Sequence, residues 1–350
     1  MVQIDHVHFY VEDAKSVGED FVKRLGFQAV GEQTTDDTHM EILQTGGLRF
    51  LLSSPLKETS SIAAYLRRHP PGVADVAFRV RDLDEILDRL VRSPRPLSPF
   101  PILPSPLVRQ GERCNQIAAW GSLRHTLIEG YCEVETSESG TFEAIDHLVL
   151  NVESREFAAA ANWYCEVFGF VPQQQFSIAT DRSSLHSQVL VHPETGVQFP
   201  INKPTSENSQ IQEFLDFNGG AGLQHIALKT SDILTTVPRM RRAGVDFLEV
   251  PETYFDRLSQ KPGFNLNGSE FQILREQEIL VDWKPSRYPA FLLQTFTKPV
   301  FKKPTFFFEV IERRTGIYDN IEIEATGFGE GNFKALFEAI ERQQIQRNSV

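Results

Sequence analysis

Two histidines and one glutamate in the second half of the sequence have residue types that can hold a metal ion. His147 lies in IDHLVLNV, His225 follows 78 positions later in LQHIALK, and Glu309 follows 84 positions after that in FFFEVIER. Each segment has the apolar pattern of a strand. On an alternating strand Glu309 shares a face with Phe307 and Ile311, where an ionised carboxylate is unfavourable unless it is paired or bound to a metal. These three residues are therefore candidates for one metal site.

Such a set supports oxygen chemistry at a divalent iron. Two imidazoles and one carboxylate on one face of the metal leave coordination positions open, as in non-haem iron oxygenases. A chelating substrate and dioxygen can then bind the same ion. The absence of cysteine from the set disfavours a structural zinc site. A single histidine in a strand is more often an ordinary core or surface residue, so the residues alone leave both interpretations open.

The first half of the chain repeats the same phrases and supplies an internal comparison. IDHVHFYVED, GVADVAFRVRDL and HTLIEGY match IDHLVLNVES, GLQHIALKTSDI and FFFEVIER. This alignment pairs His6 with His147, Asp75 with His225, and Glu129 with Glu309. Because Asp75 stands where the second half has an imidazole, we expect no metal in the first half and a structural role for His6.

The repeated phrases belong to a repeated order of strands and helices. A helix-like stretch follows each IDH phrase, and Gly26-Phe27 and Gly169-Phe170 are expected to end these helices. Glycine enters the left-handed region without strain, which suits a helix stop. Alternating strand patterns follow in both halves. The sequence therefore predicts an α+β module that occurs in tandem.

A polar segment, ETSESGT at 135–141, divides the two halves. It has little to bury, so we expect a linker between domains at 1–134 and 141–350. The last segment, GNFKALFEAIERQQ, has apolar residues at helical spacing. They are Phe333, Leu336, Phe337 and Ile340. The pattern predicts a C-terminal helix that packs on the second domain.

The composition excludes several classes of function. The net charge of −12 argues against a general nucleic-acid or anionic-membrane binder. Three cysteines without metal or redox spacing suit a reducing compartment, and no signal peptide or membrane-length apolar run is present. We expect a cytoplasmic protein. No GxGxxG, P-loop, HExxH or GxSxG motif supports nucleotide binding or serine hydrolysis.

Long, ordered segments resemble those of a known enzyme family. They are LLQTFTKPV (292–300), KPTFFFEVIERR (303–314) and GFGEGNFKALFEAIE (327–341), with FPINKP, SQIQEFLDFNGGAGLQHIAL and IDHLVLNV adding to the likeness. Together they resemble the 4-hydroxyphenylpyruvate dioxygenases. The resemblance covers essentially the whole chain, strongly from about residue 144 and loosely before it. The segment TGIYDNIEIEATG (315–327) departs from the family pattern, so no contacts are assigned within it.

The resemblance implies two tandem vicinal-oxygen-chelate domains of paired βαβββ modules, with a C-terminal lid helix on the second. Only the second domain would bind Fe(II), through His147, His225 and Glu309. The implied polar substrate contacts are Ser187, Asn202, Gln210, Gln224 and Gln294. The implied pocket walls are Pro200, Phe296, Phe307, Phe328 and Phe333, with Asn332 nearby.

Gln224 poses a geometric problem. As the strand neighbour of His225 it should face the opposite side of the sheet. Only a bulge or a strong strand twist would let both side chains line one pocket.

The implied reaction converts 4-hydroxyphenylpyruvate and dioxygen to homogentisate and carbon dioxide by oxidative decarboxylation, ring hydroxylation and side-chain migration. A dimer or tetramer is also implied. The alternatives are a 4-hydroxymandelate synthase, an extradiol dioxygenase, and a non-catalytic binding protein of the same fold. Phe296 and Pro200 resemble the homogentisate-forming enzymes, and the GFGEGNF segment argues against extradiol cleavage. The resemblance implies a place in tyrosine breakdown or in quinone and tocopherol synthesis.

Overall fold

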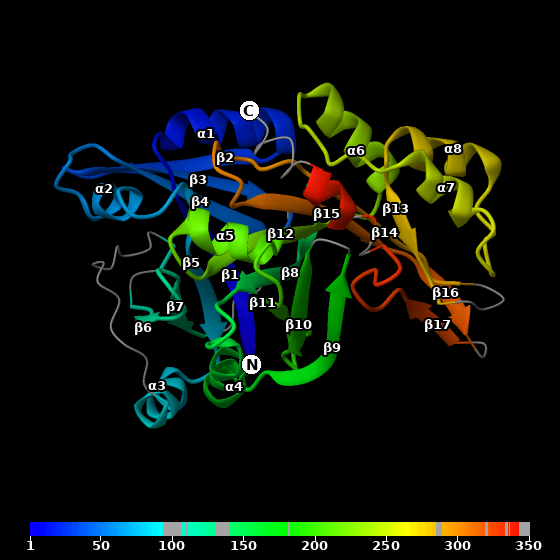
Figure 1. The fold of residues 1–350 in the computed structure, drawn as a ribbon. Helices are drawn as coiled ribbons and strands as arrows, with labels where there is room; N and C mark the ends of the chain where they lie inside the picture. The colour runs from blue at the N-terminus through cyan, green and yellow to red at the C-terminus, as the bar shows by residue number, and fades with distance from the viewer. Residues whose placement is uncertain are drawn as a thin grey trace.

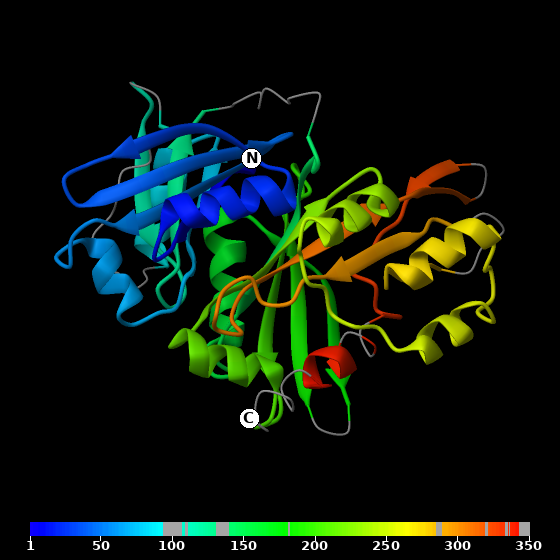
Figure 2. The ribbon, with the colours of Figure 1, turned by 90° about the horizontal axis from the view of Figure 1, so that it is seen from above.

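The computed structural model describes residues 1–93, 107–108, 111–130, 140–180, 183–284, 289–318, 321–332, 335 and 337–342. Each half of the chain forms one large sheet, and a two-stranded hairpin forms a third (Figure 1). The two halves, blue to cyan and green to red, lie side by side (Figure 2). Among the described residues no helix is both long and apolar enough to cross a membrane.

The first sheet has seven strands in the order β2-β3-β4-β1-β5-β7-β6. Its strands are β1 (Val2–Tyr10), β2 (Gln28–Thr34), β3 (Thr38–Thr45), β4 (Leu48–Pro55), β5 (Gly72–Val80), β6 (Cys114–Ala118) and β7 (Arg124–Glu129). The helices are α1 (Ala14–Asp20), which continues into the π-helical turn η1 (Phe21–Leu25), α2 (Ser61–Leu66) and α3 (Leu83–Arg92). Asp13, Ser60 and Asp82 begin these helices, since each side chain accepts a hydrogen bond from a first-turn backbone N–H.

The second sheet has eight strands in the order β13-β14-β15-β12-β8-β11-β10-β9. Its strands are β8 (Ala144–Asn151), β9 (Val171–Ala179), β10 (Ser184–Val191), β11 (Gln198–Pro204), β12 (Gly222–Lys229), β13 (Leu280–Asp282), β14 (Leu292–Phe296) and β15 (Phe307–Arg313). The helices are α4 (Phe157–Phe168), α5 (Gln210–Asn218), α6 (Ile233–Arg242), α7 (Glu252–Leu258) and α8 (Gly268–Glu276).

Both sheets are built from the same pair of modules. In the first, β1 and β5 pair antiparallel at the centre, and β4 and β7 flank them in parallel. In the second, β8 and β12 pair antiparallel, and β11 and β15 flank them in parallel. Gly26 and Gly169 end the first helix of each half with φ of 83° and 76°, as predicted. The predicted α+β fold of repeated modules is confirmed.

Aromatic side chains join the two sheets into one core. Phe50 of β4 stacks on Phe308 of β15 with ring centroids 6.0 Å apart. Phe9 of β1 meets Phe306 edge-on at 5.3 Å. Such pairs add directional contact to the burial of large apolar area. This packing occupies one face of the second sheet, so the site residues project from the other.

The C-terminal segment packs on the second half, as the apolar pattern predicts. Residues 337–342 are helical, and Phe337 is buried in a cluster with Leu185, Ile211 and Phe214. Phe333 and Leu336 lie outside the described residues.

The segment that departs from the family pattern forms the hairpin. Its strands are β16 (Thr315–Tyr318) and β17 (Ile321–Glu324), paired antiparallel. Lys229 of β12 holds it through an ion pair of 2.7 Å with Glu324. The acidic run therefore lies on an extension of the second half.

Candidate metal centre and pocket

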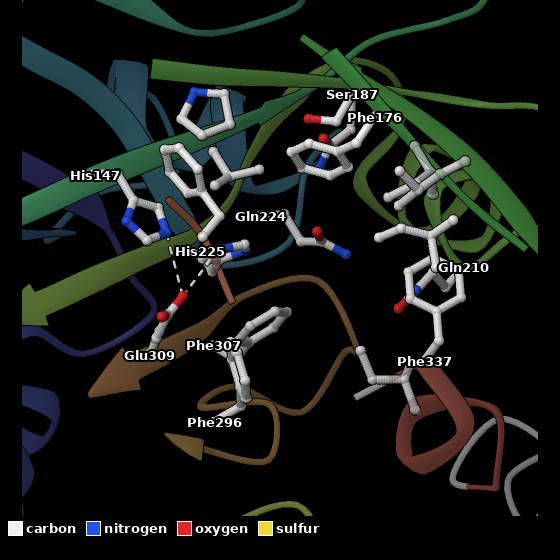
Figure 3. A pocket seen from close by; sticks show the side chains of 18 of the residues that line it. His147, Phe176, Ser187, Gln210, Gln224, His225, Phe296, Phe307, Glu309 and Phe337 are labelled. Carbon is white, nitrogen blue, oxygen red and sulfur yellow. Dashed lines mark ion pairs between the residues drawn. The ribbon is translucent and has the colours of Figure 1, made fainter. Parts of the chain in front are cut away.

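Three neighbouring strands bring His147, His225 and Glu309 together. The Nε2 atom of His147 lies 3.2 Å from Glu309 Oε2, and that of His225 lies 3.6 Å from the same oxygen. Ala227 of β12 pairs with Glu309 on one side and with His147 on the other. Its small side chain leaves room for the three larger ones to converge. Their candidate ligand atoms all lie within 4.8 Å of one another (Figure 3).

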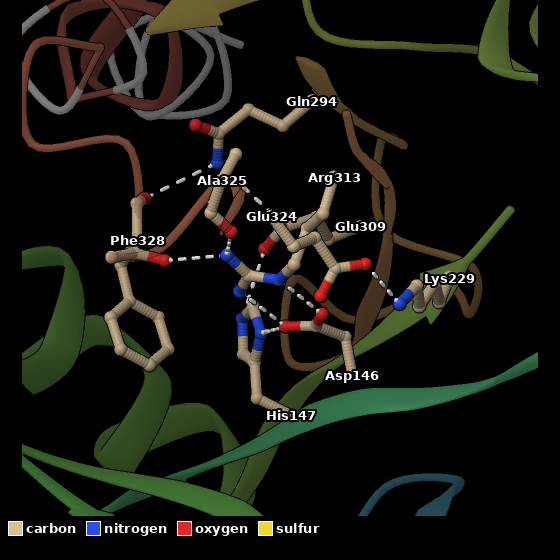
Figure 4. Close-up of polar contacts among 10 residues, drawn as sticks. Asp146, His147, Lys229, Gln294, Glu309, Arg313, Glu324, Ala325 and Phe328 are labelled. Atoms are coloured by element: carbon tan, nitrogen blue, oxygen red, sulfur yellow. Dashed lines mark hydrogen bonds and ion pairs between the residues drawn. The ribbon is translucent and has the colours of Figure 1, made fainter. Parts of the chain in front are cut away.

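A buried carboxylate fixes the orientation of His147. Asp146 Oδ1 lies 2.8 Å from His147 Nδ1, and Arg313 donates two hydrogen bonds of 2.6 and 2.7 Å to Asp146 (Figure 4). Burial would raise the pKa of Asp146, but the hydrogen bonds from Arg313 and His147 lower it. The carboxylate therefore stays ionised and accepts a hydrogen bond from Nδ1–H of His147, which directs Nε2 toward the centre.

The two imidazoles have opposite protonation preferences. Burial would lower the pKa of His147, but the Glu309 charge and the hydrogen bonds with Asp146 and Glu309 raise it to about 9. Burial and the neighbouring His147 hold the pKa of His225 well below its ordinary value. Without a metal, a proton on His147 balances the Glu309 charge, and a divalent cation would displace it.

Aromatic rings hold the imidazoles in place. Phe307 stacks on His225 at 4.7 Å with an interplanar angle of 18°, and Phe328 meets His147 edge-on at 5.1 Å. Phe296 packs against Phe307 at 6.3 Å. These rings limit rotation of the imidazoles and give the pocket apolar walls.

The pocket extends from the three candidate ligands to a polar end. Figure 3 shows His147, His225 and Glu309 on one side and Ser187 and Gln210 on the other. The lining comprises His147, Val149, Phe176, Ile178, Leu185, Ser187, Pro200, Asn202, Gln210, Ile211, Gln224, His225, Gln294, Phe296, Phe307, Glu309, Phe328, Phe337 and Ile340.

Two buried polar atoms at that end have no hydrogen-bond partner within the described part of the chain. They are Ser187 Oγ and Gln210 Oε1. Ser187 of β10 pairs across the sheet with Asn202 of β11, whose amide donates to Asn151 at 3.2 Å. Buried groups of this kind are unfavourable unless something binds to them. The polar end is therefore suited to a hydrogen-bonding ligand.

A β-bulge resolves the problem of Gln224. The pairing of β12 with β8 shifts register between Leu223 and His225, so Gln224 is the extra residue. The bulge turns its side chain to the same face as His225, and both line the pocket. The first sheet has the same bulge, between Val73 and Asp75. The bulge is thus a feature of both halves, although no residue pattern in the sequence indicates its position.

Sequence reasoning missed most of the residues that support the candidate ligands. Asp146 could have been found, because an aspartate precedes the histidine in both IDH phrases. Arg313, which contacts Asp146, had no such signal. Gln294 was expected as a substrate contact, and its contact with Glu309 across strands could not be foreseen because it depends on strand register.

Comparison with known proteins supports the relation that the sequence suggested. A family model described as the N-terminal part of hydroxyphenylpyruvate dioxygenase matches residues 1–97, and one described as the glyoxalase/bleomycin resistance protein/dioxygenase superfamily matches 144–260. The 4-hydroxyphenylpyruvate dioxygenase of Coccidioides posadasii is 33% identical, over 99% of this chain and 94% of that protein. The Yarrowia lipolytica enzyme is 34% identical, over 99% and 93%.

The chain belongs to the 4-hydroxyphenylpyruvate dioxygenase family of the vicinal oxygen chelate superfamily.

Two further relatives show that family membership alone does not fix the reaction. An uncharacterised protein of Synechocystis is 35% identical, over 99% of both chains. A solved mutant of 4-hydroxymandelate synthase from Streptomyces coelicolor has a TM-score of 0.80 at 25% identity, over 98% of this chain and 99% of that one. The chain thus resembles both a dioxygenase and a synthase with a different name, so these likenesses do not by themselves fix the product.

In this member of the dioxygenase family the expected pairing of Glu129 with Glu309 is wrong by three positions. β7 pairs with β5 so that Arg124 stands opposite Asp75. In the second sheet the residue opposite His225 lies two positions before Glu309. Thr126 is therefore the first-half counterpart of Glu309.

Glu129 instead caps a helix. Its Oε1 accepts a hydrogen bond of 3.0 Å from the backbone N–H of Leu83 at the start of α3. Glu312 accepts the equivalent bond of 2.7 Å from Ile233 at the start of α6. The Ile-Glu pairs in HTLIEGY and FFFEVIER were the sequence signal for this alignment.

The first half keeps the support for one histidine but lacks the other two candidate ligands. His6 Nδ1 lies 2.7 Å from Asp5, which also binds Arg79 at 2.7 Å and Arg49 at 2.9 Å. Asp5 and Asp146 are both the extra residue of a bulge. Asp75 and Thr126 occupy the positions equivalent to His225 and Glu309. The first half therefore lacks a complete set of metal donors, and the Asp5–His6 pair stabilises the fold.

Proposed function

We propose that the chain is an Fe(II)-dependent dioxygenase that converts 4-hydroxyphenylpyruvate and dioxygen to homogentisate and carbon dioxide. The observation that carries the proposal is the donor set of His147, His225 and Glu309 opening on an aromatic-walled pocket with a polar far end. Membership of the family supports the substrate class.

The three residues fit Fe(II). Two imidazole nitrogens and one carboxylate oxygen, without a thiolate, are the donors that this ion accepts in oxygenases. Bound there, Fe(II) would supply adjacent positions for the keto acid and dioxygen and the electrons for oxygen activation. Because Glu309 is the one carboxylate of the set, a divalent ion would leave an excess positive charge that suits the substrate carboxylate.

The polar end would hold the phenol of the substrate. Ser187, Asn202 and Gln210 lie opposite the candidate ligands, and two of these side chains have unpartnered buried atoms. Gln224 lies between the two ends, within reach of the substrate side chain (Figure 3). Neutral hydroxyl and amide groups can bind a phenol and a keto acid without placing a further charge in the pocket.

The apolar walls would position the ring and exclude water. Phe307 and Phe296 line one side, and Phe337 of the C-terminal helix closes the pocket near Gln210. Holding the ring in one orientation contributes by proximity, and a dry pocket prevents side reactions of the activated oxygen. We infer a lid role for this helix.

The alternative function is that of a 4-hydroxymandelate synthase, because the chain is similar in structure to one. The two products are isomers, so they must be separated by chromatography against both standards. With Fe(II), oxygen and 4-hydroxyphenylpyruvate, the proposal predicts homogentisate. A 4-hydroxymandelate product would replace the proposed reaction with the rival one. No turnover of 4-hydroxyphenylpyruvate would favour the extradiol or the binding-protein alternative, and adding a catechol would separate these two, because only the extradiol enzyme would cleave its ring.

A further inference from the structure

A chain of hydrogen bonds runs from α7 to Glu309. Tyr254 Oη lies 2.7 Å from Asn332 Oδ1, Asn332 Nδ2 donates to Gln294 Oε1 at 3.0 Å, and Gln294 Nε2 donates to Glu309 Oε1 at 3.1 Å. Asn332, Gln294 and Glu309 are 1%, 2% and 2% exposed. This series of hydrogen bonds is therefore shielded from water, and each side chain in it has the next one as its hydrogen-bond partner.

The direction of the chain follows from chemistry. An ionised carboxylate only accepts, so Gln294 must turn its N–H groups toward Glu309 and its oxygen toward Asn332. Asn332 must then present its N–H to Gln294 and its oxygen to Tyr254. The oxygen of Asn332 then needs a hydrogen-bond donor, and the Tyr254 hydroxyl is that donor.

The surroundings keep the Tyr254 proton available. Its oxygen accepts a hydrogen bond of 2.7 Å from Val281 N–H, and the hydroxyl lies nearer to Asn332 Oδ1 than to Val281 O, at 2.7 against 3.0 Å. Burial raises the pKa of the phenol, so it remains protonated at neutral pH.

Both N–H groups of Gln294 are engaged. One donates to Glu309 Oε1 and the other to the Phe328 carbonyl at 3.4 Å (Figure 4). This leaves Glu309 Oε2 as the carboxylate oxygen that faces the two imidazoles, at 3.2 and 3.6 Å. Gln294 thus acts on the candidate ligand, and its amide N–H groups are not free for a substrate.

We propose that Tyr254 is a positioning residue that holds Glu309 as a one-oxygen metal ligand through the amides of Asn332 and Gln294. This inference rests on the proposed metal site and deepens it. No contact between Tyr254 and the metal or the substrate is required.

Close backbone contacts at two glycines also hold this series of hydrogen bonds in place. A Cβ on Gly329, at φ 75°, would lie 1.7 Å from Gln294 Oε1. A Cβ on Gly331 would lie 2.4 Å from Asp282 Oδ1, and its backbone N–H donates to Asp282 at 2.9 Å. The backbone of the turn that carries Asn332 therefore lies directly against Gln294 at Gly329 and against Asp282 at Gly331, and a side chain at either position would collide with these groups.

The test is metal binding by Tyr254→Phe, with Co(II) as a spectroscopic substitute for Fe(II). Loss of the hydroxyl leaves Asn332 Oδ1 without its donor and frees both amides to rotate. We expect Co(II) affinity to fall about 10- to 100-fold, as for other losses of outer support to a metal ligand. The visible spectrum of the Co(II) protein should change as well, since Glu309 can then bind through both oxygens.

Tyr164→Phe is the matched control. Tyr164 is buried in α4, and its hydroxyl contacts His125 at 2.8 Å, away from the candidate ligands. This variant should lose stability but keep the Co(II) affinity and spectrum of the wild type. If Tyr254→Phe does not fold, Asn332→Asp makes the same test, because a carboxylate there cannot donate to Gln294.

The outcomes separate the two proposals. A Tyr254→Phe protein with wild-type Co(II) affinity and spectrum would overturn the positioning role while leaving the proposed reaction intact. A wild-type protein that binds Co(II) but forms no homogentisate would overturn the reaction alone. A wild-type protein that binds no divalent metal would overturn both.

Discussion

Arg313 is expected to stabilise the fold and the candidate metal site at once. Its side chain is 6% exposed, and that of its partner Asp146 is 4% exposed. It donates two hydrogen bonds to Asp146 and one each to the carbonyl oxygens of Ala325 and Gly327, at 3.1 and 3.0 Å. The residue therefore connects the support of His147 to the loop that carries Phe328.

Arg313→Gln should lower the free energy of unfolding by roughly 4 kcal/mol. Removing one partner of a buried pair costs about 3–5 kcal/mol, and the lower end applies because His147 remains beside Asp146. The two carbonyl contacts contribute about 1 kcal/mol more. Denaturant unfolding of the metal-free protein measures this loss. Co(II) affinity should fall about 10- to 100-fold because His147 loses its fixed orientation.

Arg79→Gln in the first half is the matched control. Arg79 binds Asp5 beside His6 in the same manner, with no complete donor set nearby. It should lower stability but leave Co(II) affinity unchanged. Equal loss of Co(II) affinity in both variants, or none in Arg313→Gln, would show that Arg313 does not support the candidate metal site.

Three further predictions follow from single groups. Because a metal must displace the proton of His147, whose pKa is raised to about 9, Co(II) affinity should rise about tenfold per pH unit from pH 6 to 9 and then level off; a flat titration series would contradict this. Burial raises the pKa of Asp75 from 3.8 to about 7, so the unfolded chain releases this proton first and the free energy of unfolding should fall between about pH 4 and 7 by up to roughly 4 kcal/mol. Asp75→Asn should remove that fall, and parallel pH curves for both proteins in denaturant would count against it. Gly329→Ala should weaken Co(II) binding by pushing Gln294 aside, whereas Gly196→Ala, also at positive φ but with no atom within 4 Å of the new Cβ, should not; similar Co(II) binding by the two variants would show that the contact with Gln294 is not the cause.

The candidate ligands could be predicted from the sequence because each lies in a strand phrase that the first half repeats, although only His147 has a counterpart of the same type, His6. His147 and His225 occupy strand phrases that recur in the first half, and Asp75 shows where the pattern breaks. The duplicated α+β fold followed from the same repeat. Those features depend on local periodicity, which a single sequence displays.

The contacts around the ligands could not be predicted, because they depend on register and bulges. The equivalence of Glu129 and Glu312 has only the shared Ile-Glu pair as its signal in the sequence, and the strand pairing and the matching helix contacts are what establish it. The place of Gln224 needed a bulge, and the contact of Tyr254 with Asn332 joins residues 78 positions apart. Such contacts are set by tertiary packing rather than by sequence pattern.

Oxygen uptake with Fe(II) and 4-hydroxyphenylpyruvate, compared between the wild type, His225→Ala and Asp75→Asn, is the decisive measurement for the proposed iron site. We expect iron-dependent uptake with formation of homogentisate in the wild type, its loss in His225→Ala, and its retention in Asp75→Asn. Loss of uptake in Asp75→Asn as complete as in His225→Ala would contradict the assignment of the metal to the second half. Absence of iron-dependent uptake in the wild type would contradict the proposed reaction itself.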